Sequence, residues 1–135
     1  MYILQWDEKY AVGIASIDSD HRDLFEVYNE LYGSFLRGES NSMTAEKMEL
    51  LAQFTRSHFA EEERLMEETG YPRLEEHRAS HRLLDEQVNA MMEAMRRGEA
   101  VMNVPALKFL SEWITGHTLQ EDRAYVPWVQ QNAGA

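Results

Sequence analysis

The sequence predicts an all-α protein: an antiparallel, up-down four-helix bundle preceded by an irregular N-terminal arm. Apolar residues recur at steps of three and four through four long segments, which is the spacing of amphipathic helices. Glycines follow three of these segments, and prolines stand just beyond two of the breaks between them. We therefore expect a single domain at 1–135, with the arm at 1–17 and the helical bundle at 18–128.

Each predicted helix carries its own apolar stripe. The helices are expected at 19–37, 44–68, 72–97 and 104–118. The stripe residues are Leu24, Phe25, Tyr28, Leu31, Tyr32 and Phe35 in the first helix, Leu51, Phe54 and Leu65 in the second, Leu74, Leu84, Val88, Met91 and Met95 in the third, and Leu107, Leu110 and Ile114 in the fourth. A solvated acidic face is expected for Glu61, Glu63, Glu67 and Glu68.

The ends of the helices also carry signals. Asp18 is expected to cap the first helix and Asn103 the fourth, because a side-chain oxygen there can accept a hydrogen bond from a free backbone N–H. For the second helix the candidate caps are Ser42 and Thr44. The expected stop residues, where a left-handed conformation suits glycine, are Gly38, Gly70 and Gly98.

Composition narrows the range of functions. The chain has no cysteine, which excludes disulfides and thiolate metal sites. Its net charge of -11 would be repelled by nucleic-acid backbones and anionic membranes, so neither is an expected partner. No apolar run approaches the roughly 20 residues that span a bilayer, and the N-terminus lacks the features of a signal peptide. We expect a cytoplasmic protein.

The most informative side chains are the histidines, because all five lie on apolar stripes rather than on charged faces. They are His21, His58, His77, His81 and His117. Residues at i and i+4 lie about 40° apart around a helix, so His77 and His81 project into one space. His58 and Glu62 do the same on the second helix.

His117 and Asp122 have a different spacing. Five residues correspond to about 140° around a regular helix, so both side chains can face the core only under one condition. The helix must end, loosen or bulge between the two residues. Such departures from regular helix are common at functional sites.

Metal binding and ordinary packing both have to be considered for these residues. A single histidine on an apolar stripe is more often a core residue than a ligand, and a His-Glu pair one turn apart is a common surface ion pair. Five unpaired buried imidazoles, however, would strongly destabilise one core, and a metal centre removes that penalty. Imidazole and carboxylate ligands suit iron, manganese, cobalt or zinc. If Glu62 and Asp122 bridge two octahedral ions that share a solvent oxygen, the histidines leave one position open for a small diatomic ligand.

The motifs also resemble those of the hemerythrin family, specifically the single-domain bacterial hemerythrins, along nearly the whole chain. The matching pieces are Trp6 ahead of Val12, Gly13 and Ile14, then the segments IDSDHR at 17–22, HFAEE at 58–62, GYP at 70–72, HRASH at 77–81 and HTLQED at 117–122. Every histidine of the chain falls within this series, which makes the resemblance specific.

The resemblance implies two iron ions joined by an oxo or hydroxo bridge. The implied ligands are His77, His81 and His117 on one iron, His21 and His58 on the other, and Glu62 and Asp122 as bridges to both. Dioxygen would bind reversibly at the iron that keeps an open position. The implied oxygen pocket is lined by Leu24, Phe59, Trp113, Ile114 and Thr118.

Thr118 departs from the family pattern, which usually has an aliphatic residue at this position. A hydroxyl group there would either hydrogen-bond the bound oxygen or admit water and hasten autoxidation. We hypothesise the second effect.

The expected function is reversible oxygen binding, for storage, for delivery to an oxygen-consuming client enzyme or for scavenging, without enzymatic turnover. Two alternatives stay open. One is a di-iron enzyme with peroxidase or nitric-oxide-reducing activity, although such bundle enzymes use carboxylate-rich Glu-x-x-His sites. The other is a sensor of oxygen, redox state or nitric oxide that acts through a separate partner. A monomer is favoured, although the sequence does not fix the oligomeric state.

Overall fold

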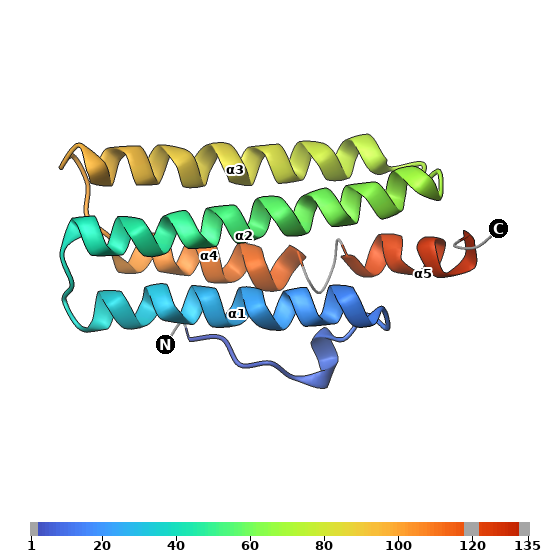
Figure 1. The fold of residues 1–135 in the computed structure, drawn as a ribbon, viewed down its shortest axis with the longest axis horizontal. Coiled ribbons are helices and arrows are strands. Elements are labelled where there is room, and N and C mark those ends of the chain that lie inside the picture. Colours follow the sequence, from blue (N-terminus) through green and yellow to red (C-terminus); the bar gives the residue numbers. More distant parts are fainter. Residues whose placement is uncertain (1–2, 118–121, 133–135) are drawn as a thin grey trace.

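The computed structural model of the chain describes residues 3–117 and 122–132, and these ranges contain helices and connections but no strand. A short 3-10 helix, η1 (Glu8–Tyr10), precedes the α-helices, which are α1 (Ala15–Leu36), α2 (Asn41–Glu68), α3 (Leu74–Arg96), α4 (Val104–Gly116) and α5 (Asp122–Asn132). Figure 1 shows α1 to α4 packed alongside one another, each antiparallel to the one before it, with α5 continuing beyond α4. The predicted all-α antiparallel bundle is confirmed.

The first helix begins earlier than the sequence predicted. α1 starts at Ala15, and Asp18 lies inside its first turn. The Asp18 carboxylate accepts hydrogen bonds from the backbone N–H groups of Val12 (2.8 Å) and Gly13 (3.3 Å) in the arm. Gly13 has a φ of 91°, a left-handed conformation that favours glycine. Asp18 therefore ties the arm to α1, and the predicted cap at this position is wrong.

The other helix ends agree with the sequence only in part. Ser40 caps α2, since its hydroxyl accepts a hydrogen bond of 3.2 Å from a backbone N–H of the first turn. The Thr44 hydroxyl instead donates to the Ser40 carbonyl at 2.8 Å, so the candidates Ser42 and Thr44 are both wrong. Asn103 caps α4 as predicted, through a hydrogen bond of 2.9 Å. The predicted stop residues have positive φ values, namely Gly38 (67°), Gly70 (69°) and Gly98 (73°).

Two clusters of buried apolar side chains lie along the bundle. The larger cluster draws on α1, α2, α3 and α4. The smaller cluster joins α2 to α5 and consists of Met66, Tyr125, Val126 and Val129. On α2, Phe59 belongs to the larger cluster and Met66 to the smaller one, so Glu62 lies in a layer between them.

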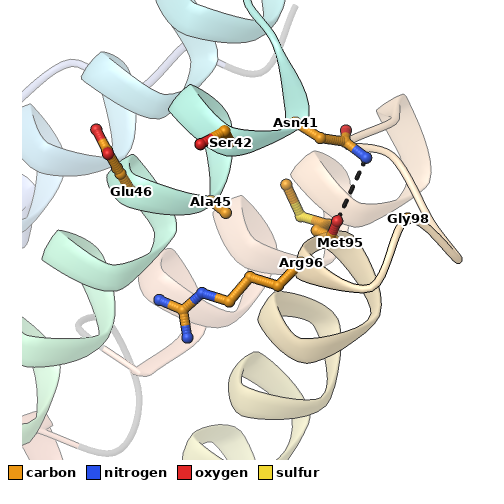
Figure 2. Close-up of a pocket in the computed structure, with 7 residues that line it drawn as sticks. All are labelled: Asn41, Ser42, Ala45, Glu46, Met95, Arg96 and Gly98. Carbon is orange, nitrogen blue, oxygen red and sulfur yellow. Dashed lines mark hydrogen bonds between the residues drawn. The ribbon is translucent and has the colours of Figure 1, made fainter.

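The connection between α3 and α4 closes the end of the bundle that lies far from α5. The Asn41 side chain, at the start of α2, donates hydrogen bonds to the carbonyls of Met95 (3.4 Å) and Ala100 (2.9 Å). Figure 2 shows Asn41 reaching Met95 across a surface pocket that Glu46 and Arg96 also border. These contacts hold the start of α2 against the end of α3.

Candidate metal centre

Seven buried polar side chains meet in the layer that contains Glu62. They are His21 on α1, His58 and Glu62 on α2, His77 and His81 on α3, His117 at the C-terminal end of α4, and Asp122 at the start of α5. Each of them is at most 7% exposed. Every side chain that the sequence singled out as a candidate ligand is therefore brought to one place in the interior.

The end, loosening or bulge of the helix that is predicted between His117 and Asp122 falls on residues 118–121, which lie outside the described residues. α4 ends at Gly116, His117 follows it, and α5 begins at Asp122. Both side chains reach the core, where His117 is 2% exposed and Asp122 is 0% exposed.

The nitrogen and oxygen atoms of these side chains form two compact groups. One group comprises Glu62, His77, His81 and His117, and the other comprises His21, His58, Glu62 and Asp122. Within each group, one such atom per residue lies within 4.8 Å of all the others. Ligands on opposite sides of one ion, with bonds of about 2.1 Å, are separated by about 4.2 Å. Each group is therefore compact enough to surround one cation, and Glu62 belongs to both.

Both carboxylates face histidines of the two groups. Asp122 places Oδ1 2.9 Å from His117 Nε2 and Oδ2 2.6 Å from His21 Nε2. Glu62 places Oε1 3.1 Å from His117 Nε2, and the same oxygen contacts His58 Nε2. Each carboxylate thus lies between histidines of different groups.

Many of these buried atoms have no hydrogen-bond partner within the described part of the chain. They are Nε2 of His21, His58, His77 and His81, Oε2 of Glu62, and both carboxylate oxygens of Asp122. His21 Nε2 and Asp122 Oδ2 approach to 2.6 Å without the alignment of a hydrogen bond. A buried, unpaired polar group costs about 1–3 kcal/mol, and a cation at the centre would remove this cost. The residues present therefore fit a metal centre.

The protonation states of the centre also suit metal binding. Burial lowers the pKa of His81 to about 2, so its imidazole is neutral at pH 7. Burial would raise the pKa of Glu62, but His117 and His58 outweigh it and hold this pKa well below its usual range. Burial likewise opposes the charged form of His58, but Glu62 prevails and raises its pKa. Neutral imidazoles and ionised carboxylates are the forms that bind metals, so a bound cation would oppose the upward shift of the His58 pKa.

Two further carboxylates hold histidine rings from the side away from the centre. Asp20 Oδ2 lies 3.0 Å from His58 Nδ1, and Glu63 Oε2 lies 2.8 Å from His81 Nδ1. An ionised carboxylate only accepts hydrogen bonds, so each Nδ1 carries the proton and each Nε2 presents its lone pair to the centre. Metal-bound histidines commonly donate their second N–H to a carboxylate in this way.

The sequence reasoning missed both of these carboxylates. Glu63 was expected on a solvated face, but its side chain is only 25% exposed and contacts His81 and Arg78. The sequence did contain a signal for them. A histidine that binds a metal commonly donates its second N–H to a carboxylate, so acidic residues near the candidate ligands could have been considered as acceptors. Asp20 and Glu63 stand directly beside candidate ligands in the chain.

Aromatic rings cover the three-histidine side of the centre. Of the predicted oxygen-pocket residues, Leu24, Phe59 and Ile114 are buried and Trp113 is half-buried. The Phe59 ring stacks on His81, with 3.7 Å between centroids and 2° between planes. The Trp113 ring stacks on His117 at 4.6 Å and 11°. Thr118 lies outside the described residues.

Fold and site together define a helical-bundle domain with a buried cluster of histidines and carboxylates that could hold cations. A family model described as "Hemerythrin HHE cation binding domain" matches residues 12–129. The chain belongs to the hemerythrin family, whose domains are of the non-haem iron, oxygen-binding type.

Individual relatives agree with this assignment. Bacteriohemerythrin of Pseudomonas aeruginosa (strain LESB58) is 34% identical over 130 residues, which cover 96% of this chain and 83% of that protein. Bacteriohemerythrin of Methylococcus capsulatus is 24% identical over 128 residues, covering 94% of this chain and 97% of that protein. A crystal structure of wild-type hemerythrin matches with a TM-score of 0.88 at 23% identity, over 94% of this chain and 98% of that one, which supports the fold.

Proposed function

We propose that this chain binds dioxygen reversibly at two iron ions held in the buried centre. The observation that carries the proposal is the pair of four-residue groups that share Glu62, each compact enough for one ion. Membership of the hemerythrin family supports iron as the metal and dioxygen as the ligand.

The ligands are divided unequally in this proposal. They are His77, His81 and His117 on one iron, His21 and His58 on the other, and Glu62 and Asp122 as bridges, together with an oxo or hydroxo bridge. The iron held by His21 and His58 would have fewer protein ligands, and it would therefore be the one that binds a small ligand. When bound, the iron pair supplies the electrons that dioxygen takes up and returns on release.

The chain's own contribution is to hold the ligands and to exclude water. His81 and Glu62 are already in the protonation states that a metal needs. The apolar side chains of Leu24, Phe59 and Ile114, together with the half-buried Trp113, limit the access of water to the bound oxygen. Thr118, which the family resemblance assigns to the oxygen pocket, lies outside the described residues, and we propose that its hydroxyl hastens autoxidation.

The proposed ligand set supports a binding role rather than enzymatic turnover. Histidine outnumbers carboxylate here, whereas di-iron enzymes of helical bundles use carboxylate-rich Glu-x-x-His sites. We propose storage, delivery to an oxygen-consuming enzyme or scavenging, by a monomer in the cytoplasm. None of the described helices is long and apolar enough to cross a membrane. The net charge of -11 disfavours nucleic acid as a partner.

The test combines metal analysis with visible spectra of the reduced protein, of the same sample in air, and of that sample after oxygen is removed. We expect two irons per chain and a coloured adduct that forms in air and disappears on deoxygenation. An iron content other than two per chain would refute the proposal of a di-iron centre. Continuous oxygen consumption with a reductant, without a reversible adduct, would mean catalysis instead of binding.

A further inference from the structure

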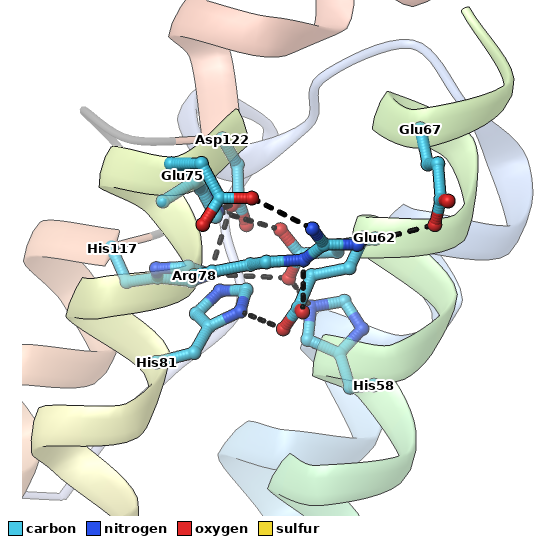
Figure 3. A network of polar contacts seen from close by, with 10 residues as sticks. His58, Glu62, Glu67, Glu75, Arg78, His81, His117 and Asp122 are labelled. Carbon is cyan, nitrogen blue, oxygen red and sulfur yellow. Dashed lines mark hydrogen bonds and ion pairs between the residues drawn. The ribbon is translucent and has the colours of Figure 1, made fainter. Parts of the chain in front are cut away.

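An arginine on α3 links three carboxylates beside the metal centre. Arg78 donates from Nε to Glu63 Oε1 (3.1 Å), from Nη1 to Glu75 Oε1 (2.9 Å) and from Nη2 to Glu67 Oε2 (3.1 Å). Figure 3 shows Arg78 extended between Glu75 and Glu67, with His81 next to it. Because all three nitrogens of the planar guanidinium are engaged, its position is well defined.

Glu63 connects this arginine to a candidate ligand. Its Oε1 accepts from Arg78, while its Oε2 lies 2.8 Å from His81 Nδ1. The contacts run from α3 to α2 and back to α3. They lead inward from side chains that are 28% and 25% exposed, those of Arg78 and Glu63, to the His81 ring at 3%. A charged surface network thus ends on an imidazole of the three-histidine group.

In the group that contains His21 and His58, the carboxylate that contacts a histidine Nδ1 has different surroundings. His58 Nδ1 lies 3.0 Å from Asp20 Oδ2, and the Asp20 side chain is 34% exposed. Within residues 3–117 and 122–132, no arginine or lysine pairs with Asp20. The Asp20 carboxylate is thus partly exposed to solvent, whereas the Glu63 carboxylate is paired with Arg78.

We propose that Arg78 and Glu63 act as positioning residues that set the donor strength of His81, and through it the redox preference of the ion in the three-histidine group. The proposal rests on the di-iron function described above. A carboxylate that accepts the Nδ1–H makes the imidazole more basic, so Nε2 becomes a stronger ligand and favours ferric iron. The Arg78 cation draws charge away from the same carboxylate and limits this effect.

The two positioning residues therefore have opposite effects on the metal, which a purely structural ion pair would not have. Glu63→Gln keeps a hydrogen-bond acceptor for His81 but removes the charge, and it should favour ferrous iron. Arg78→Gln leaves the Glu63 carboxylate without its cation, and it should favour ferric iron. The matched control is Glu67→Gln, because Glu67 contacts Arg78 without touching a histidine.

The experiment measures the reduction potential of the iron-loaded variants by spectroelectrochemistry. We expect Glu63→Gln to shift the ferric-to-ferrous ratio about tenfold toward ferrous, which equals about 59 mV upward for one electron. Arg78→Gln should shift the potential downward, and Glu67→Gln should leave it at the wild-type value. A shift of the same sign in Glu63→Gln and Arg78→Gln, or shifts no larger than in the control, would overturn the proposal.

A second measurement keeps this proposal separate from the oxygen-binding function. With Co(II) as the only metal, Glu63→Gln should release the ion to a chelator about tenfold faster than Glu67→Gln does. Equal release rates would overturn the role of Glu63, whatever iron and oxygen do. A wild-type protein that forms no reversible coloured adduct would refute the function instead, and the cobalt comparison would still decide the role of Glu63.

Discussion

Replacing Phe59 with alanine would open the three-histidine side of the centre. Phe59 is 5% exposed, and its ring lies flat on His81 with 3.7 Å between centroids. Both residues also border a surface hollow of about 230 Å³ between α2 and α3. Loss of the ring would extend this hollow toward the centre and admit water.

The expected loss of stability follows from the burial of the ring. A phenylalanine buries roughly 200 Å² of surface, which at about 25 cal/mol per Å² corresponds to about 5 kcal/mol as an upper bound. Since the neighbouring hollow lets water fill part of the space, we expect the lower end of the range for such truncations, about 3 kcal/mol.

The assay separates packing from protection of the centre. The matched control is Leu107→Ala, because Leu107 is 0% exposed and lies in the larger apolar cluster. This truncation should lower the free energy of unfolding by a similar amount, roughly 2–5 kcal/mol. Denaturant titrations give the free energy of unfolding, and decay of the oxygenated spectrum gives the lifetime of the adduct. We expect Phe59→Ala to shorten that lifetime about tenfold relative to Leu107→Ala. Equal lifetimes at equal stability would show that Phe59 contributes packing alone.

Three other predictions concern the same centre. After dialysis, the Glu62→Gln variant should retain at most about a tenth of the metal that the Glu67→Gln variant retains. Equal metal contents would contradict the place of Glu62 in both groups. In the metal-free protein, the pKa of His81 is about 2 in the folded state against 6.5 in an unstructured chain, so unfolding takes up a proton as the pH falls below 6.5. The contribution of His81 to the free energy of unfolding should therefore fall by about 1.4 kcal/mol per pH unit, at most, and denaturant titrations of His81→Gln should show a shallower pH dependence than wild type. Thr118→Ile should lengthen the lifetime of the oxygenated form, and an unchanged lifetime would remove the hypothesis about its hydroxyl.

The residues that meet in the core could be predicted because helix geometry is local. A turn of about 3.6 residues fixes that His77 and His81 share a face, as do His58 and Glu62. The same number predicted that the helix ends, loosens or bulges between His117 and Asp122 if both side chains face the core, and both side chains are buried there. Periodicity therefore predicted that these polar side chains converge in the core, whereas the two apolar clusters on either side of them are seen only in the structure.

The features that were missed depend on contacts between distant parts of the chain. Asp18 failed as a cap because the arm folds against α1 and takes up its carboxylate. Glu63 looked like a solvated residue because its partners, His81 and Arg78, lie on another helix. Helix periodicity describes one element at a time and does not show which side chains a neighbouring helix will present.

Asp122 reaches the centre on a short helix, α5, that depends on contacts with the rest of the chain. α5 has 11 residues, which is too short to be stably helical by itself. It is fastened by Tyr125 in the smaller apolar cluster and by a hydrogen bond of 2.8 Å from Trp128 Nε1 to the Thr69 carbonyl. A metal that binds only the folded chain adds about 4 kcal/mol to its stability at a thousandfold excess over Kd. With Asp122 as a ligand, as proposed, the order of α5 and the occupancy of the centre would be thermodynamically linked. Fraying of α5 would withdraw the ligand, and metal binding would suppress the fraying.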